Sequence, residues 1–129
     1  DPKALSTIYR GRKGELVLIG WTPDFLDPHA NASSFAWNPK NTDDSNDHTV
    51  AWRIHWDIPD LTKRTDALWT EPDHQKRGEG YVQLQRVMQA TSPFAFMFQG
   101  SLSFASRANV NGIVEGPLFD QLLLARVTK

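Results

Sequence analysis

The residues best suited to chemistry are two carboxylates on one short stretch, Asp24 and Asp27, which also contains Trp21 and Phe25. Separated carboxylates can act as an acid and base pair in glycoside hydrolysis. Three residues apart on one loop, they would flank a substrate poorly, and Asp27 before Pro28 is more simply a turn or cap residue. Asp24 instead suits an ammonium group, since the rings can cover the apolar part of a ligand. An exposed loop aspartate is otherwise commonly structural or solvated.

A short apolar run, residues 16–19, leads into this stretch and lies between Gly14 and Gly20. Its length and aliphatic composition predict a buried strand, because a helix would need more residues. Pro23 and Pro28 then remove backbone donors and prevent a helix. The carboxylates are therefore expected on an irregular loop at the end of a strand, where α/β sheets usually bind ligands.

The rest of the chain is predicted to combine helices with strand-like segments. Strands are predicted at residues 94–98 and 101–108, and residues 50–56 are predicted to be a strand or an extended segment. Capping residues and helical spacing predict helices that begin at Asp1-Pro2, His29, Pro59 and Pro72-Asp73.

Aromatic residues make up 11% of the chain and are expected mainly in its core. The run at residues 94–98 is typical of a strand covered on both faces. The tryptophans outside the Asp24 stretch are expected to pack rather than to bind. The predicted packing residues are Phe94, Phe96, Phe98, Phe104, Phe119, Trp37, Trp52, Trp56 and Trp69.

Composition excludes several classes of function. The 129 residues, 40% hydrophobic and 22% charged, predict one ordinary globular domain. A net charge of -1 argues against a nucleic-acid partner, which would require a basic surface. No run reaches the length of a membrane span. Because the chain starts at Asp1-Pro2 within a helical pattern, we expect a processed or dissected piece of a longer protein.

A metal or cofactor site is not predicted. His48 and His55 are seven residues apart, near the acidic residues 43, 44 and 47, but this spacing matches no compact metal motif. Absence of cysteine excludes thiolate zinc sites and cysteine nucleophiles. A solvated acidic loop is the simpler interpretation.

The stretch at residues 20–28 resembles a motif of the extracytoplasmic solute-binding proteins of peptide and nickel ABC importers, Gly-Trp-x-x-Asp-aromatic-x-Asp-Pro. The resemblance covers nearly the whole chain and implies an α/β fold. This fold is part of a two-lobed periplasmic-binding-protein type II architecture, mostly its C-terminal lobe. Residues 1–99 would belong to that ligand-binding lobe, and residues 100–129 would cross the hinge toward the first lobe. Further stretches follow in the family's order, at residues 50–53, 73–77, 81–86, 92–99 and 109–113.

The resemblance implies a binding protein that makes and breaks no bond. It would capture a peptide or similar small amine-bearing, cationic solute in the bacterial periplasm or at the cell surface and deliver it to an ABC importer. Asp24 would pair with the α-amino group of the ligand, and Trp21, Thr22 and Phe25 would complete the site. Expected partners are the remainder of the binding protein and the membrane subunits of the importer. An exposed sheet edge would also allow a dimer by strand addition.

Two other classes of function stay open. One is a small protein-interaction domain that uses an aromatic surface, and the other is a carboxylate-dependent hydrolase built on Asp24 and Asp27. The sequence contains no visible pair of base and nucleophile, and no helix-in-groove pattern, to favour either. The ligand class, whether dipeptide, oligopeptide, nickel complex, sugar or opine, is not set by these residues.

Overall fold

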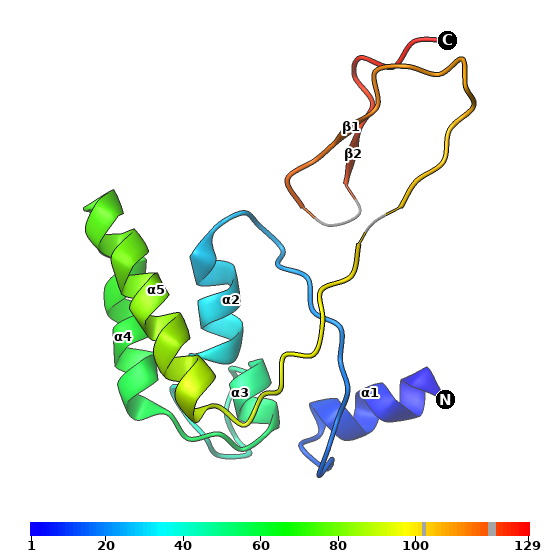
Figure 1. Ribbon diagram of the computed structural model, residues 1–129. Helices are drawn as coiled ribbons and strands as arrows, with labels where there is room; N and C mark the ends of the chain where they lie inside the picture. The colour runs from blue at the N-terminus through cyan, green and yellow to red at the C-terminus, as the bar shows by residue number, and fades with distance from the viewer. Residues whose placement is uncertain (102, 119–120) are drawn as a thin grey trace. The chain divides into compact units, whose positions relative to one another are not determined.

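A computed structural model of the chain (Figure 1) describes all residues except 102, 119 and 120. The described residues form two compact units. The first unit comprises residues 1–20 and 27–94, and the second comprises residues 21–26 and 95–129.

The first unit is helical, and side-chain caps start most of its helices. Asp1, Asp27, Thr49 and Asp73 each accept a hydrogen bond from a backbone N–H in the first turn of the helix they precede. The helices predicted to begin at Asp1, His29, Pro59 and Asp73 are confirmed, and the helix at Pro59 forms without a side-chain cap. Their bounds are α1 Pro2–Arg10, α2 Pro28–Phe35, α3 Val50–Arg53, α4 Pro59–Trp69 and α5 His74–Thr91.

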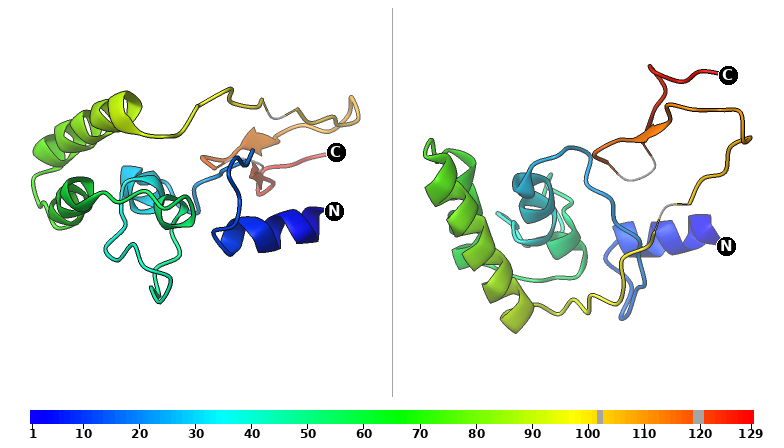
Figure 2. Two further views of the ribbon diagram at one scale, coloured as in Figure 1. Left: turned by 90° about the horizontal axis from the view of Figure 1, so that it is seen from below. Right: turned by 45° about the horizontal axis from the view of Figure 1, so that its top comes forward.

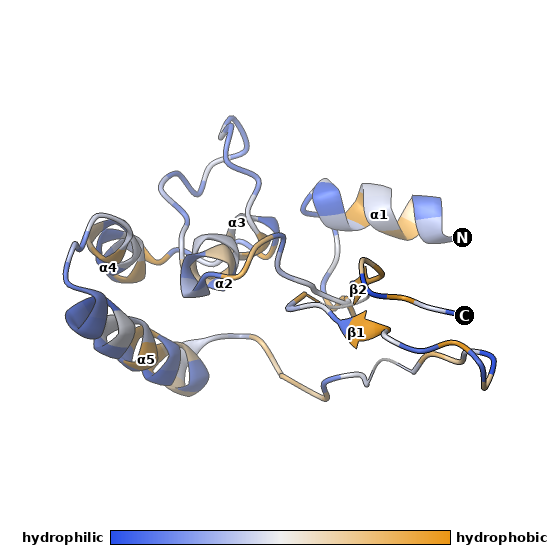
Figure 3. Ribbon diagram, turned by 90° about the horizontal axis from the view of Figure 1, so that it is seen from above, coloured by the Kyte–Doolittle hydropathy of each residue, from blue (hydrophilic) through white to orange (hydrophobic). Residues whose placement is uncertain are grey.

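Helices α2, α4 and α5 pack against one another, and α3 packs against α2 (Figures 1 and 2). The fully buried residues of helix α2, Ala30 and Ala32, are small, which lets its neighbours approach closely, and Phe35 packs against the edge of the core. Gly80 does the same on α5, since a Cβ atom there would lie 2.2 Å from Leu68 Cδ2. The core residues are Ala32, Ala36, Ala51, Ile58, Leu61, Tyr81, Leu84 and Met88. Figure 3 shows the apolar positions of these helices in orange.

The strands predicted in the first unit, at residues 16–19 and 50–56, are wrong. Residues 16–19 form no strand, and Leu16 and Leu18 are 95% and 72% exposed. An isolated strand gains nothing unless a partner satisfies its backbone, and the described part of this unit contains no strand. Residues 50–56 are also not extended. Thr49 caps α3, which buries Val50, Ala51 and Trp52.

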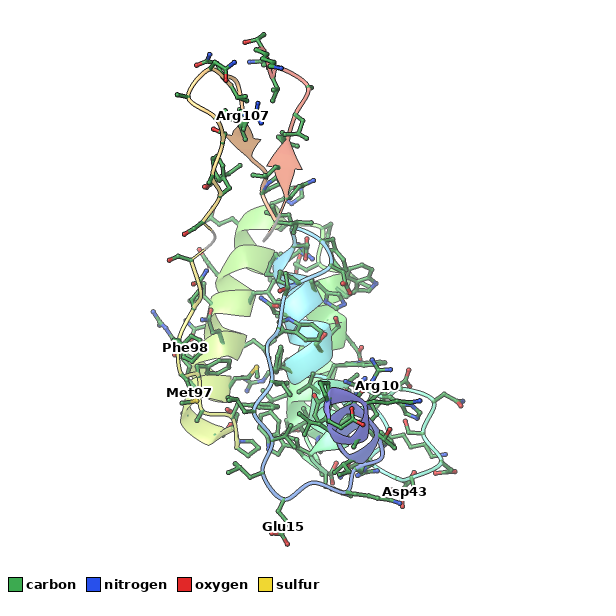
Figure 4. All side chains as sticks on the ribbon, turned by 90° about the vertical axis from the view of Figure 1, so that its right-hand side faces the viewer. Arg10, Glu15, Asp43, Met97, Phe98 and Arg107 are labelled. Atoms are coloured by element: carbon green, nitrogen blue, oxygen red, sulfur yellow. The ribbon has the colours of Figure 1, made fainter. Side chains whose placement is uncertain are left out.

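The predicted strands at residues 94–98 and 101–108 are also wrong for the residues described there. Phe96, Phe98 and Phe104 are 68%, 83% and 45% exposed, so they are not core residues. Figure 4 labels Met97 and Phe98 on the extended segment after α5. Phe94 alone of this group packs against the helical core, and Phe119 lies outside the described residues.

The second unit contains a small antiparallel hairpin. Strand β1, Val114–Glu115, pairs with β2, Leu122–Leu123, and an isolated bridge joins Asn111 to Thr128. Gly112, between the bridge at Asn111 and β1, has φ +79°, and a Cβ atom there would lie 2.0 Å from the Arg126 carbonyl oxygen, so this position requires glycine.

The structure therefore provides five helices and one two-stranded sheet over the described residues. The α/β fold of a two-lobed binding protein stays a prediction, as does the boundary between residues 99 and 100. No helix in the described ranges is long and apolar enough to cross a membrane.

Candidate functional site

The four residues predicted to bind ligand lie on the part of the second unit that begins after residue 20. Asp24 and Thr22 are exposed, and Trp21 and Phe25 are 41% and 46% exposed. The segment has no regular secondary structure. It therefore carries one carboxylate, one hydroxyl and two partly covered rings, which are residue types that can bind a small cation with an apolar body.

Asp27, three residues after Asp24, has a different environment. Its carboxylate caps α2 by accepting from the His29 backbone N–H at 2.7 Å. Both oxygens also accept from Arg77, at 2.9 Å from Nη1 to Oδ2 and 2.8 Å from Nη2 to Oδ1. Only 31% of the Asp27 side chain and 17% of the Arg77 side chain are exposed. The prediction that Asp27 is a cap residue is confirmed.

Arg77 is the centre of a group that we call the Arg77 cluster, which consists of Asp27, His29, Trp69, Arg77 and Tyr81. The guanidinium lies 4.9 Å from the centre of the Tyr81 ring. His29 Nδ1 lies 2.9 Å from the Tyr81 hydroxyl oxygen, and the His29 and Trp69 rings are 4.1 Å apart. The cluster joins residues from α2, α4 and α5, with Asp27 at the start of α2.

The cluster changes the acidity of its members in a consistent way. The hydrogen bond from Arg77 holds the pKa of Asp27 below its ordinary value, although burial opposes this. Burial lowers the pKa of His29 and raises that of Tyr81. The cluster therefore favours a charged Asp27–Arg77 pair beside a neutral imidazole and a neutral phenol.

Arg77 is the residue that sequence reasoning missed. Its type and spacing indicate a solvated cation or a weak ion pair, whereas it is largely buried and bidentate. A signal for this was present in α5. Arg77 lies four residues before Tyr81, so both residues are on the same face of the helix. This is the face that buries Tyr81, Leu84 and Met88.

A second buried arginine lies in the turn after α1. Only 4% of the Arg12 side chain is exposed. It donates to Asp43 Oδ1 and Asn41 Oδ1, each at 3.0 Å, and lies 4.5 Å from the centre of the Trp52 ring. Asp43 belongs to the long segment between α2 and α3 (Figure 4). Arg12 therefore ties the α1 turn to the helical unit.

Both ring nitrogens of His55 form hydrogen bonds with Arg12. Arg12 Nη2 lies 2.7 Å from His55 Nδ1 and, since a guanidinium only donates, Nδ1 accepts. His55 Nε2 then carries the proton and donates to the Arg12 carbonyl oxygen at 3.0 Å. His48 stacks on Trp52 at 4.2 Å. Over the residues with described positions, no group of three or more histidine, aspartate or glutamate side chains could hold a metal.

Comparison with known proteins identified no matching family model, no matching curated protein and no matching solved structure. The family assignment therefore still depends on the motif at residues 20–28 and on the further stretches that come after it in order. The ligand-binding roles of Asp24, Trp21, Thr22 and Phe25 stay predictions.

Proposed function

We propose that the chain is part of an extracytoplasmic binding protein that captures a peptide or similar small amine-bearing solute for an ABC importer. The observation that carries the proposal is an exposed carboxylate, Asp24, on the same short segment as two partly exposed rings, Trp21 and Phe25, in a motif that resembles this family. A carboxylate and an ammonium group form a charge-assisted hydrogen bond, and aromatic faces attract the same cation. Thr22 adds a hydroxyl.

The environment of Asp27 supports binding over hydrolysis. A pair of catalytic carboxyl groups needs one member with a raised pKa, so that it can donate a proton. Both oxygens of Asp27 instead accept from Arg77, which lowers the pKa of the carboxyl group. Asp27 is therefore poorly suited to act as the acid partner of Asp24.

Exposed apolar side chains support the proposal that two segments of this chain pair with strands from other polypeptide. Leu16, Leu18, Phe96, Met97 and Phe98 are between 68% and 95% exposed. Both segments have the composition of strands, and unpaired strands readily add a partner strand. On this proposal the partner strands come from the remainder of the binding protein, or from a second copy of the chain. The importer's membrane subunits would then receive the ligand.

The test compares wild type with Asp24→Ala in the whole protein that carries this chain. Each is mixed with a pool of short synthetic peptides, either untreated or acetylated at the α-amino group, and retained peptides are quantified by mass spectrometry. We expect wild type to retain untreated peptides about tenfold or more over acetylated ones, and Asp24→Ala to lose this preference, because one charge-assisted bond is worth about 1.5–3 kcal/mol.

Asp57→Ala is the matched control, since Asp57 is an exposed aspartate in the first unit. It should behave as wild type. Equal retention of both pools by wild type and Asp24→Ala, or retention of neither, would contradict the proposal. Capture of a folded protein without any peptide would favour the interaction domain instead.

A further inference from the structure

We propose that the first unit contains a binding site for a guanidinium group, and that the chain's own Arg12 fills this site. The site, which we call the guanidinium site, consists of Asn41, Asp43, Trp52 and His55. When Arg12 is absent, a free guanidinium compound or the arginine side chain of another molecule can take its place. The inference does not depend on the proposed function, since all five residues belong to the first unit.

The site contacts the terminal nitrogens and the face of the guanidinium. Arg12 Nη1 donates to Asp43 Oδ1 at 3.0 Å. Arg12 Nη2 meets three acceptors, which are Asn41 Oδ1 at 3.0 Å, the Asn41 carbonyl oxygen at 3.3 Å and His55 Nδ1 at 2.7 Å. The Trp52 ring centre lies 4.5 Å from the guanidinium carbon. One carboxylate, several neutral acceptors and an aromatic face suit a planar guanidinium better than a compact ammonium group.

The site is also held by contacts that do not involve the guanidinium. Asn41 Nδ2 donates to the His55 carbonyl oxygen at 3.1 Å, and Asn41 Oδ1 also accepts from Asn38 Nδ2 at 3.0 Å. Trp52 is buried, and its Nε1 donates to the Thr42 carbonyl oxygen at 2.9 Å. These acceptors and the ring should therefore keep their places when the guanidinium is removed, as in a site prepared for a ligand.

The segment at residues 1–20 is attached to the rest of the first unit in the way that a bound peptide would be. Over the described residues, every hydrogen bond between this segment and residues 27–94 involves Arg12. Arg12 and His55 both have φ +59°, and no other non-glycine residue with a described position has positive φ. Such a backbone is unfavourable for a residue with a side chain, so the contact outweighs strain at both of its ends.

A small cation can reach the site from solvent. The Asp43 side chain is 91% exposed and His55 is also exposed, whereas the Arg12 side chain is only 4% exposed. Removal of the Arg12 side chain should therefore open a space beside two acceptors that solvent already reaches. Glycine suits position 12, because it adopts positive φ without strain.

The experiment measures thermal unfolding of the full chain with Arg12→Gly in millimolar methylguanidinium chloride or methylammonium chloride. Methylguanidinium has the terminal nitrogens of arginine, and its methyl group takes the place of Cδ. We expect Arg12→Gly to unfold at a lower temperature than wild type. Methylguanidinium should raise its midpoint by about 5–10 °C at about ten times the dissociation constant. Methylammonium should raise it little, and wild type should respond to neither salt because Arg12 already fills the site.

Arg10→Gly is the matched control, since Arg10 is an exposed arginine of the same segment. Methylguanidinium should not raise its midpoint. Asp43→Ala combined with Arg12→Gly removes the carboxylate of the site and should weaken methylguanidinium binding about threefold, as expected for an exposed charge. Arg12→Lys decides the question if Arg12→Gly does not fold. Its ammonium group fits the acceptors less well, so methylguanidinium should displace it and raise the midpoint.

An Arg12→Gly chain that does not respond to methylguanidinium, or responds equally to methylammonium, would overturn the inference. An equal rise in Arg10→Gly, or binding unchanged by Asp43→Ala, would also overturn it. If Arg12→Gly does not fold in any of the solutions, an Arg12→Lys midpoint that stays constant would have the same meaning. None of these outcomes concerns Asp24, so the proposed function would stand.

Discussion

At the scale of single residues, two aspartates of one short stretch have opposite surroundings. Asp24 is exposed, whereas Asp27 accepts three hydrogen bonds that fix it between α2 and Arg77. The aspartate side chain is thus available to a ligand at position 24, whereas at position 27 its oxygens are occupied by hydrogen bonds within the fold. The contrast comes from the next residues of the chain, since only Asp27 directly precedes a helix whose first turn needs a cap.

His29 should make the stability of the first unit depend on pH. Burial lowers its pKa, and the Arg77 charge acts in the same direction, while Asp27 and Asp66 oppose the shift. Below the ordinary value of 6.5, the unfolded chain therefore binds more protons than the folded chain. The free energy of unfolding should keep its full value above pH 6.5. It should decrease as the pH falls through the lowered pKa that His29 has in the folded chain.

Urea unfolding between neutral and mildly acidic pH measures this dependence. His29→Asn, whose amide can take the place of Nδ1 beside Tyr81, should flatten the curve. His74→Asn, at an exposed histidine, should keep the wild-type slope. Asp27 cannot cause a slope in this window, because its pKa lies below its ordinary 3.8. Parallel curves for wild type and His29→Asn would show that this imidazole is not the source.

At the scale of secondary-structure elements, helices could be predicted and strands could not. A helix satisfies its own backbone within four residues, so Asp1, Asp27 and Asp73 reveal its start locally. A strand depends on a partner that the pattern at residues 16–19 does not specify. Arg77 and Asp27 are fifty residues apart in the sequence. Their contact therefore could not be predicted from local sequence patterns either.

Substitution by alanine should have different effects on stability at two glycines of α5. A Cβ atom at Gly78 would meet no atom within 4 Å, whereas at Gly80 it would lie 2.2 Å from Leu68 Cδ2. Gly78→Ala should therefore raise the free energy of unfolding by about 0.5–1 kcal/mol, the difference in helix propensity. Gly80→Ala should gain less or lose stability, because Leu68 must move out of its packing.

Chemical denaturation of the two variants against wild type measures both values. Leu68→Ala provides the matched background, since it removes the atoms that a Cβ at Gly80 would meet. In that background Gly80→Ala should recover most of the gain seen at Gly78. Equal gains at both glycines in the wild-type background would show that α4 and α5 are not in close contact at this point.

At the scale of the whole molecule, the first unit has a helical core, but two apolar segments, at residues 16–19 and 96–98, are not part of that core. Leu16, Leu18, Phe96 and Phe98 expose surface that an independent protein would bury. The resemblance to a two-lobed binding protein offers a reason, because in that proposal other strands lie beside these segments.

Association of the 129-residue chain should depend on these apolar segments. At micromolar concentrations, we expect sedimentation to show oligomers, since unpaired apolar segments of strand composition add to one another. Leu18→Lys with Phe98→Lys should shift the distribution toward monomer, because a charge on each segment opposes pairing. Val82→Lys, which alters an exposed apolar residue of α5, should leave it unchanged. A wild-type chain that stays monomeric would mean that these segments are ordinary surface.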